Sequence, residues 1–545
     1  MQIPASDHGL LNGIGPSRLV SARGQGVGDD YWVLAARSGG ALHRRTQGRG
    51  DTYDPRIGRS FMRQHSVFLI VFGLAALLRL VTMIAYFPAF WYSDSFGYLP
   101  SALHPYPFAA RPVGYSLLLL WPLRVFHSVA AVAVVQHVFG LLAGILIYVL
   151  LRLRFQFASW TATLAAAPVL LSAYEIQLEH FMLSDALFMI LTVAALVIAL
   201  WRQVPSILAC IAVGLLLGAA AITRTEGLPM IATFALAVLV WNASFPERLA
   251  RVVALAVSFA LPVLVYATWF QEVHGNFELE SIYGGAFLAA RVEPFADCSV
   301  IQPPANERWL CLSTPVSRRL PPDQYLWGPA AVTPLARPPT GPAFSARTSA
   351  VAEKFAIHAI KHEPRAYSAS VWRMFLQTFK WNSGPYTNGQ QTWMFPAHQP
   401  ETVAQLARAN RAGTTDQSFY QYNGGRNPDT EFRQPWAQIL RVYQDFAVVV
   451  PPALAGIVIL GLVGIWVAFR RRGGPAFLPW ITGMLMLVFP AAVSGYEARY
   501  VVPTVPFFCV AAALAVREIG NRNQRASGRR DAPGALNRIR GGTRR

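Results

Sequence analysis

Asp94 is the only acidic residue between the first two long apolar segments of this 545-residue sequence. It lies in the run WYSDSFGY, 91–98, with Arg79 before it and Arg111 after it. A carboxylate in this setting can accept a proton from a hydroxyl nucleophile. An aspartate in a Ser-Asp-Ser run can instead cap a helix or close a turn. Tyr98 could stack on a sugar ring, or it could belong to an interfacial aromatic belt.

A second polar group, residues 175–185, joins two later apolar segments. Glu179 and His180, together with Asp94, are residue types that bind divalent cations, which makes a metal site one hypothesis. Their scattered spacing implies no firm cofactor. Asp185 follows a serine at the start of an apolar segment, where it could cap a helix or orient a substrate. His180 is a further candidate for substrate contact.

Two tight turns each combine an arginine with a glutamate, namely Arg224 with Glu226 and Arg499 with Glu497. An arginine at a membrane surface can simply extend toward lipid headgroups. The functional alternative is paired, charge-assisted binding of a phosphate group. Two such turns favour a shared phosphate site, with Tyr496 beside it as a sugar or acceptor contact.

The composition indicates that these residues are positioned by membrane helices. The chain is 54% hydrophobic and 14% charged, with a mean hydropathy of +0.34, which excludes an ordinary soluble protein. Much of the net charge of +19 comes from arginines near the two ends. Arginines beside apolar segments set membrane orientation and attract anionic lipids, so we expect membrane lipids and no nucleic acid as partners.

Apolar segments predict an all-α polytopic membrane protein with about ten transmembrane helices. The stretch 113–126 is short and contains a proline, which predicts an interfacial or partly inserted segment. The predicted spans are 66–86, 128–151, 159–174, 183–201, 205–223, 227–242, 250–270, 445–469, 475–494 and 499–516.

Basic residues fall in alternate short loops, at 152–154, 202, 247–251 and 470–472. The positive-inside rule assigns these loops and both termini to the cytoplasm. The polar groups of the first three paragraphs then share the extracytoplasmic side. A one-sided set of charges in a membrane protein predicts a functional site there.

Five regions follow from this topology: a disordered cytoplasmic extension (1–62), a transmembrane core (63–270), an extracytoplasmic loop domain (271–444), further transmembrane helices (445–516) and a basic cytoplasmic tail (517–545). The loop domain contains two amphipathic stripes within 347–380. They predict helices that lie in the membrane interface or face the core of a small domain. Cys298 and Cys311 lie close in this loop, where an oxidising compartment favours a disulfide.

Four short motifs together resemble the GT-C superfamily of membrane glycosyltransferases. They are Arg79 with the later Asp94, the segment RPVGY at 111–115, the segment LSDALF at 183–188 leading to Arg224, and the segment ARYVVP at 498–503. The likeness covers about 60–270 and 445–516. It is nearest to protein O-mannosyltransferases, lipid A aminoarabinose transferases and actinobacterial mannosyl- or arabinosyltransferases. Many relatives have two acids in the first loop, whereas this chain has one.

The resemblance implies a bacterial inner-membrane enzyme with an extracytoplasmic active site. A sugar would move from a polyprenyl-monophosphate carrier to a hydroxyl group of a cell-envelope glycan, lipid or protein, with inversion. Asp94 would be the general base, and Arg224, Arg499 and Arg111 would bind the donor phosphate. Tyr98, Asp185, His180, Glu226 and Tyr496 would contact the acceptor or sugar.

Two other functions remain open at the level of sequence. A ligase or polymerase for diphosphate-linked glycans would share the arginines and the large loop. A lipid or solute transporter would place polar groups deeper in the bilayer, often within repeats. The pair Gln136 and His137 is the only obvious polar pair well inside a predicted span.

Overall fold

The computed structural model describes residues 55–530, except 242, 328–333, 337, 340, 343, 381–393, 410–415 and 469–473. The chain divides into two compact units, Met1–Arg59 and Ser60–Arg545, and nearly all described residues belong to the second. Most of the predicted N-terminal extension and the last part of the basic tail, 531–545, therefore lie outside the described residues.

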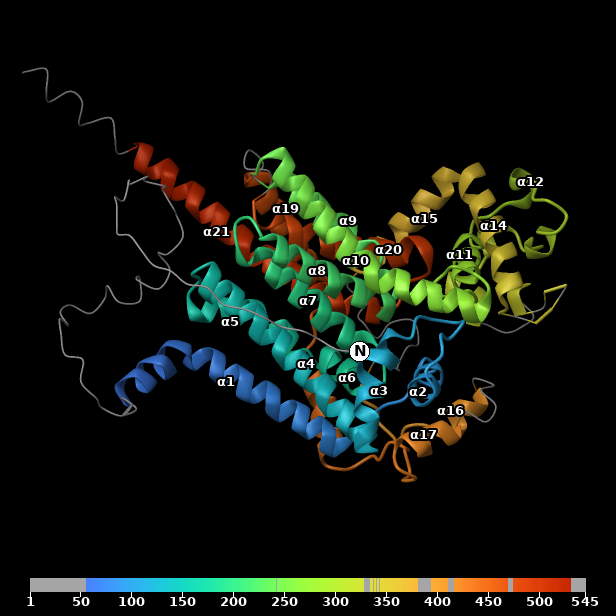
Figure 1. Cartoon of the computed structure of the whole chain (residues 1–545), viewed down its shortest axis with the longest axis horizontal. Coiled ribbons are helices and arrows are strands. Elements are labelled where there is room, and N and C mark those ends of the chain that lie inside the picture. Colours follow the sequence, from blue (N-terminus) through green and yellow to red (C-terminus); the bar gives the residue numbers. More distant parts are fainter. Residues whose placement is uncertain are drawn as a thin grey trace, which may run out of the picture. The chain divides into compact units, whose positions relative to one another are not determined.

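The described chain is mainly helical. Among its residues, the only β-type pairing is an isolated bridge between Phe90 and Phe181. The long apolar helices are α1 (Pro55–Ala85), α4 (Val129–Val149), α5 (Ser159–Leu171), α7 (Asp185–Trp201), α8 (Ile207–Thr223), α9 (Met230–Val240), α10 (Phe245–His274), α19 (Pro451–Val467), α20 (Phe477–Val493) and α21 (Val505–Arg530). Between them lie α2 (Ser95–Leu103), α3 (Trp121–Leu123), α6 (Ala173–His180), α11 (Gly284–Val292), α12 (Cys298–Ile301), α13 (Pro322–Trp327), α14 (Ala346–His362), α15 (Pro364–Gln377), α16 (Val403–Ala409), α17 (Asp416–Tyr422) and α18 (Trp436–Gln444) (Figure 1).

The protein is an all-α polytopic membrane protein, as predicted. Among the described residues, four helices are long and apolar enough to cross a bilayer, within Met62–Ala85, Val129–Arg154, Phe245–His274 and Ala498–Arg522. Shorter apolar helices of 10–17 residues match the other predicted spans. A helix of 17 residues is about 26 Å long, slightly less than a hydrocarbon core of about 30 Å. The predicted short stretch forms the helical run Ser116–Phe126.

Two glycines bring α8 and α10 into close contact. A Cβ atom on Gly214 would lie 1.9 Å from Ser258 Oγ, and one on Gly218 would lie 2.4 Å from Pro262 Cγ. Small residues four apart allow membrane helices to pack backbone to backbone. The position of α8 fixes Arg224, which directly follows its last residue.

The basic loops meet at the opposite end of the bundle from the site described below. Arg517 in the middle of α21 donates to the backbone oxygen of Phe155, just after the helical run Val129–Arg154. Arg251 near the start of α10 donates to Pro205 O at 2.8 Å, just before α8. Each contact joins two of the segments that the sequence assigns to the cytoplasmic side, whereas the basic loop 470–472 lies outside the described residues.

The predicted loop domain, 271–444, consists of two separately packed parts. In the first part, the apolar stripe of α14, including Phe355 and Ala359, is buried against α11. This stripe faces the core of a small domain, whereas α15 packs on α20 through Phe375 and leaves Trp372 59% exposed. In the second part, α16 and α17 pack beneath α2, where Tyr422 donates to Leu120 O at 2.7 Å (Figure 1).

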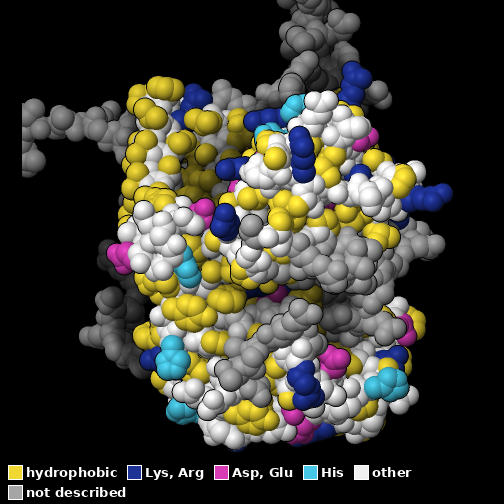
Figure 2. Space-filling view, turned by 90° about the vertical axis from the view of Figure 1, so that its right-hand side faces the viewer, with side chains coloured by type: hydrophobic (Ala, Val, Ile, Leu, Met, Phe, Trp, Pro, Cys, Tyr) yellow, Lys and Arg dark blue, Asp and Glu magenta, His cyan; other side chains and the backbone are white. Residues whose placement is uncertain are grey.

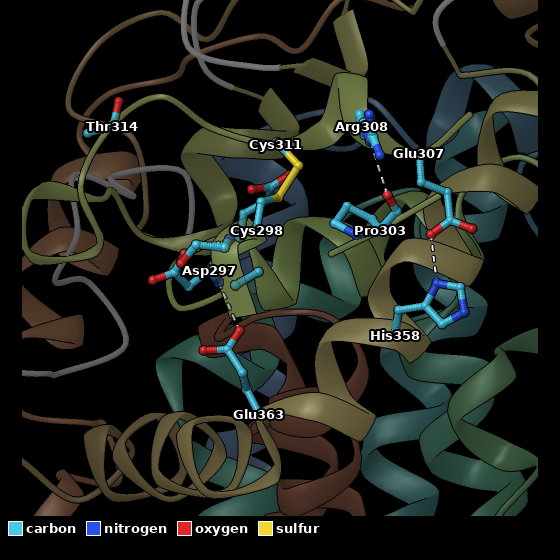
Figure 3. The surroundings of a disulfide bond; sticks show 12 residues. Asp297, Cys298, Pro303, Glu307, Arg308, Cys311, Thr314, His358 and Glu363 are labelled. Atoms are coloured by element: carbon cyan, nitrogen blue, oxygen red, sulfur yellow. Dashed lines mark hydrogen bonds and ion pairs between the residues drawn. A yellow bond between two sulfur atoms is a disulfide. The ribbon is translucent and has the colours of Figure 1, made fainter. Parts of the chain in front are cut away.

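A disulfide joins Cys298 and Cys311, which confirms the predicted pair. Figure 3 shows the polar contacts that hold this segment on α14 and the start of α15. His358 bonds to Glu307 at 2.8 Å, and Glu363 accepts from the backbone N–H of Asp297 at 2.8 Å. The irregular chain around the disulfide is thereby fixed to regular helices.

Candidate functional site

A cavity of about 1490 Å³ lies where the predicted outer loops meet. Its polar lining comes from separate segments and includes Asp94, Arg111, Arg224, Glu226, Glu280, Glu497 and Arg499. Its apolar lining includes Phe287, Leu288, Phe344, Phe489, Pro490 and Val493, from α11, α20 and nearby chain. Figure 2 views the end of the molecule that carries α2, α11 and α14, and a hollow with hydrophobic walls is visible at its upper left.

Asp94 joins two arginines that are remote in sequence. Its Oδ2 atom accepts from Arg499 Nη1 at 3.0 Å and pairs with Arg111. The residue stands at the N-terminus of α2, but its side chain makes no capping hydrogen bond. The capping alternative for Asp94 is therefore wrong, and its carboxylate serves the ion pairs.

Gly114 explains how Arg111 reaches this position. A Cβ atom on Gly114 would lie 2.4 Å from Ile222 O, so only glycine lets this segment rest against the end of α8. The neighbouring Val113 N–H donates to the Tyr266 hydroxyl at 3.2 Å. The close packing of the RPVGY segment on the end of α8 thus places Arg111 near the turn that carries Arg224.

Arg224 is held by two carboxylates. Its Nη1 lies 2.5 Å from Asp185 Oδ1, and its Nη2 lies 3.2 Å from Glu226 Oε1. Glu226 lines the cavity, whereas Asp185 stands behind Arg224 and does not contribute to the lining. Asp185 is therefore placed to orient the arginine.

Aromatic rings connect the two turns. The Tyr500 ring centre lies 5.6 Å from the Arg224 guanidinium carbon and 5.5 Å from that of Arg499. Arg499 also lies 5.2 Å from the ring of Tyr92 and forms an ion pair with Glu497 at 2.6 Å. A cation over a tyrosine ring is stabilised by the ring quadrupole, so these rings fix both arginines at the cavity wall.

Tyr98, which the sequence predicts as a sugar contact, lines the cavity. Its hydroxyl donates to Ser184 Oγ at 3.1 Å, and its ring makes an edge contact with Tyr115. The Arg111 guanidinium lies 5.8 Å from its centre. Tyr98 therefore has a fixed orientation between two segments of the site.

The carboxyl groups of the cavity differ in their electrostatic surroundings. Burial alone would raise the pKa of Asp94, but Arg111 and Arg499 outweigh burial and hold that pKa well below its usual range. Burial raises the pKa of Glu497, and it raises the pKa of Glu280 to about 7. The acids that line the cavity outnumber the three arginines. The raised pKa values of Glu497 and Glu280 favour their neutral forms and so reduce the negative charge of the site.

His180 and Glu179 do not line the cavity. Glu179 pairs with Arg79 at 2.6 Å and with His137 at 2.8 Å, and His137 lies 3.1 Å from His180 Nδ1. His180 Nε2 lies 2.7 Å from the backbone oxygen of Tyr86. We refer to Arg79, His137, Glu179 and His180 as the internal network. The predicted substrate contact by His180 is not supported by this placement.

The hypothetical metal set Asp94, Glu179 and His180 is not brought together. Asp94 belongs to the cavity, whereas the other two belong to the internal network. Across the described ranges, no group of three or more histidine, cysteine or acidic side chains could hold a metal ion.

Tyr496 lies apart from the main site. It lines a second cavity of about 50 Å³ together with Tyr174, Glu175 and Thr378. Its neighbour Glu497 lines the large cavity. The predicted sugar contact by Tyr496 therefore falls outside the main site.

Glu280 and Tyr283 were not identified from the sequence as site residues, although both line the large cavity. Their segment follows the long helix α10 directly, and acids close to the end of a predicted span were an available signal. Glu272 and Glu278 share that signal, so sequence alone could not select Glu280 among them.

No protein-family model and no curated protein matches the chain. Solved structures of the oligosaccharyltransferase of Archaeoglobus fulgidus are similar to it. The apo form has 14% sequence identity and a TM-score of 0.40, and the match covers 86% of this chain and 52% of that chain. The complex of AglB with an inhibitory peptide and a dolichol-phosphate has 14% identity and a TM-score of 0.38, with the same two coverages. The chain thus spans about half the length of the structures it matches.

Proposed function

We propose that the protein is an integral membrane glycosyltransferase of the GT-C type, which moves a sugar from a polyprenyl-monophosphate carrier to a hydroxyl acceptor. One observation carries this proposal. Arg111, Arg224 and Arg499, from three separate segments, converge on a cavity at the ends of apolar helices, and the same cavity has an apolar wall. A phosphate attached to a lipid tail needs both of these surfaces.

The arginines supply the phosphate site. Each guanidinium carries five N–H donors in a planar fork, and the ion pair of Arg111 with Asp94 uses one of its three nitrogens. Donors that face a phosphate stabilise the negative charge that grows on it as the sugar leaves. Arg224 and Arg499 share Tyr500, so they can act on the same phosphate.

The apolar wall fits the first isoprene units of the carrier. Phe489 and Val493 lie on or at the end of the membrane helix α20, and Phe287 lies on α11, which contacts α20. The cavity volume exceeds the range of about 300–1,000 Å³ that is usual for one drug-sized ligand. The donor headgroup and an acceptor can therefore occupy it together.

The reaction is an in-line displacement at the anomeric carbon. The acceptor oxygen forms the new bond to that carbon, the bond to the phosphate oxygen breaks, and the electron pair stays on the phosphate. The sequence predicted Asp94 as the base. Its two arginine partners favour a different role, because a carboxylate held ionised by two cations is a weak base. In this proposal Asp94 holds Arg111 and Arg499 toward the phosphate.

We further propose that the cavity faces the extracytoplasmic side of a bacterial plasma membrane and that both termini are cytoplasmic. The basic loops at the far end of the bundle support this orientation. The Cys298–Cys311 disulfide supports an oxidising compartment for the region beside the cavity.

Purified protein in lipid nanodiscs can test the function with a panel of radiolabelled polyprenyl-phosphate pentoses and hexoses and with cell-envelope extracts as acceptors. We expect label transfer from one monophosphate donor, and loss of transfer in Arg499→Gln. Arg251→Gln, at the opposite end of the bundle, is the matched control and should retain activity. Transfer from diphosphate donors only would show a ligase or polymerase. No transfer, combined with substrate movement across vesicles, would show a transporter.

A further inference from the structure

Two carboxyl groups of the cavity differ in their partners. Asp94 accepts from Ser93 and Arg499 and pairs with Arg111, so both of its oxygens are engaged. Glu280 lines the same cavity, yet within the described part of the chain no arginine or lysine forms an ion pair with it. A carboxylate that is paired with two guanidinium groups stays ionised and takes up a proton less readily than a carboxylate without a cation partner.

The segment that carries Glu280 is fixed to the first outer loop. The backbone N–H groups of Ser281 and Ile282 both donate to Ala109 O, at 2.8 and 3.1 Å. His274 at the end of α10 lies 2.6 Å from Pro107 O. These bonds hold Glu280 beside the loop that ends in Arg111.

The other end of the segment is fixed to α14. Gly285 N–H donates to Ser349 Oγ at 3.0 Å, and a Cβ atom on Gly285 would lie 2.0 Å from Ser349 O. The backbone therefore approaches α14 more closely than any other residue would allow. Glu280 is thus held on both sides, as a catalytic group must be if it is to meet a substrate atom in a defined position.

We propose that Glu280 is the general base that takes the proton from the acceptor hydroxyl. This inference rests on the glycosyltransferase function proposed above. The proton moves from the acceptor oxygen to the Glu280 carboxylate as that oxygen bonds to the anomeric carbon. The bond from that carbon to the phosphate breaks, and the arginines receive the charge of the departing phosphate.

The surroundings of Glu280 suit this role. Groups that face it are Arg111 from the first outer loop, Glu226 from the turn after α8, Tyr266 on α10, and Glu278 and Tyr283 on its own segment, with Glu353 of α14 acting on Glu278. Burial raises its pKa the most, Arg111 opposes the rise, and the two glutamates add to it. The resulting pKa of about 7 is near the operating pH that makes a general base efficient.

The test measures kcat of transfer between pH 5.5 and 9 at saturating donor and acceptor, in the same nanodiscs. Because the ionised form of Glu280 is the active one, wild-type kcat should rise through about pH 7 and then level off. Glu280→Gln should lower the plateau by roughly 10²–10⁴-fold and remove the rise. Glu272→Gln, at an exposed position near the end of α10 that does not line the cavity, is the matched control and should behave as the wild type.

Two further measurements separate a base from a structural residue. Binding of radiolabelled donor should change by less than about threefold in Glu280→Gln, since the phosphate site is intact. Acceptors with more acidic hydroxyl groups should lose less rate in this variant, because they depend less on a base.

The failures are distinguishable. Wild-type transfer with an unaltered rate and pH profile in Glu280→Gln would overturn the role of Glu280 and leave the proposed function standing. A wild-type profile without a rise near pH 7 would also overturn it, even if the variant does not fold. Absence of transfer by the wild type from every donor would overturn both.

Discussion

The internal network and the charged residues that line the large cavity, here called the cavity cluster, contain the same kinds of residue in different surroundings. In the internal network, Arg79 donates to both Glu179 oxygens, and it also donates to the backbone oxygens of Ala75 and Leu170. Glu179 and His180 are both 0% exposed. The arginines of the cavity are also paired with acids, but they line a volume of about 1490 Å³.

The difference shows that buried charge in a membrane protein has two separate uses. A closed set of partners ties helices together, here α1, α4 and α6, and leaves no room for a ligand. An open set keeps part of each charged group available to a substrate. Burial and ion pairing do not distinguish the two cases, whereas the presence of a cavity does.

Arg79→Ala should give the largest loss of stability, because it leaves the Glu179 carboxylate buried without its guanidinium. Removal of one partner of a buried ion pair costs about 3–5 kcal/mol. Thermal unfolding of the purified protein in detergent measures the effect. Arg63→Ala, at an exposed position of the same helix, should change stability by less than about 0.5 kcal/mol. If Arg79→Ala and Arg63→Ala had the same melting temperature, the internal network would not be needed for stability.

Arg499→Gln should act mainly on catalysis. Loss of a donor that stabilises transition-state charge lowers kcat by roughly 10²–10³-fold, or about 2.7–4 kcal/mol. Its carboxylate partners border the cavity, where water can solvate them, so the melting temperature should fall less than in Arg79→Ala. The transfer rate and the melting temperature should be measured for both Arg499→Gln and Arg79→Ala. If the two variants lost the same amount of stability, and each lost activity only in proportion to that loss, the separate roles of the two regions would be refuted.

Gly140→Ala should disturb the internal network without removing any charge. A Cβ atom there would lie 1.7 Å from Glu179 Oε1 and 2.9 Å from Arg79 Nη2, so the ion pair must shift. Overpacking of this kind costs about 1–3 kcal/mol. Gly73→Ala on α1 is the control, because a Cβ atom there meets nothing within 4 Å. A denaturation series that gives the same midpoint for both variants would contradict the assigned role of Gly140.

Glu293 offers a smaller test, in a region that belongs to neither cluster. It is buried, its Oε1 atom has no hydrogen-bond partner, and burial raises its pKa to about 8 from an ordinary 4.5. The folded state therefore binds the proton more tightly, and this stability is lost as the pH rises through about 8. We expect the melting temperature to fall between pH 5 and 8 and then to level off, and to fall less in Glu293→Gln. Glu272→Gln, at an exposed site, should keep the wild-type dependence.

The helices and several site residues could be predicted because their signals are local. An apolar run long enough to span a bilayer forms a helix wherever it lies, since the backbone must satisfy its own hydrogen bonds there. Alternating basic loops then place Asp94, Arg224 and Arg499 on one side. The order of the segments is enough to predict this shared side, whereas the contacts among the three residues depend on the packing.

Neighbouring residues show where local reasoning ends. Glu179 and His180 lie only a few residues before Ser184, which lines the cavity, yet α6 directs them toward α4 and α1. Tyr496 and Glu497 are adjacent and line different cavities. The sequence shows that each of these positions is polar, but it does not show which part of the structure the side chain faces.

The sequence by itself determined the membrane class, the number and order of the apolar helices and the side on which the charged turns gather. These properties are sums over short stretches of chain, because hydrophobicity and loop charge act segment by segment. The tertiary structure alone decided which acids close on an arginine and which face a cavity, and it brought Glu280 beside Arg111. Those outcomes depend on contacts between residues that are distant in the sequence, such as Asp94 and Arg499, which only the packing of the helices and outer segments can set.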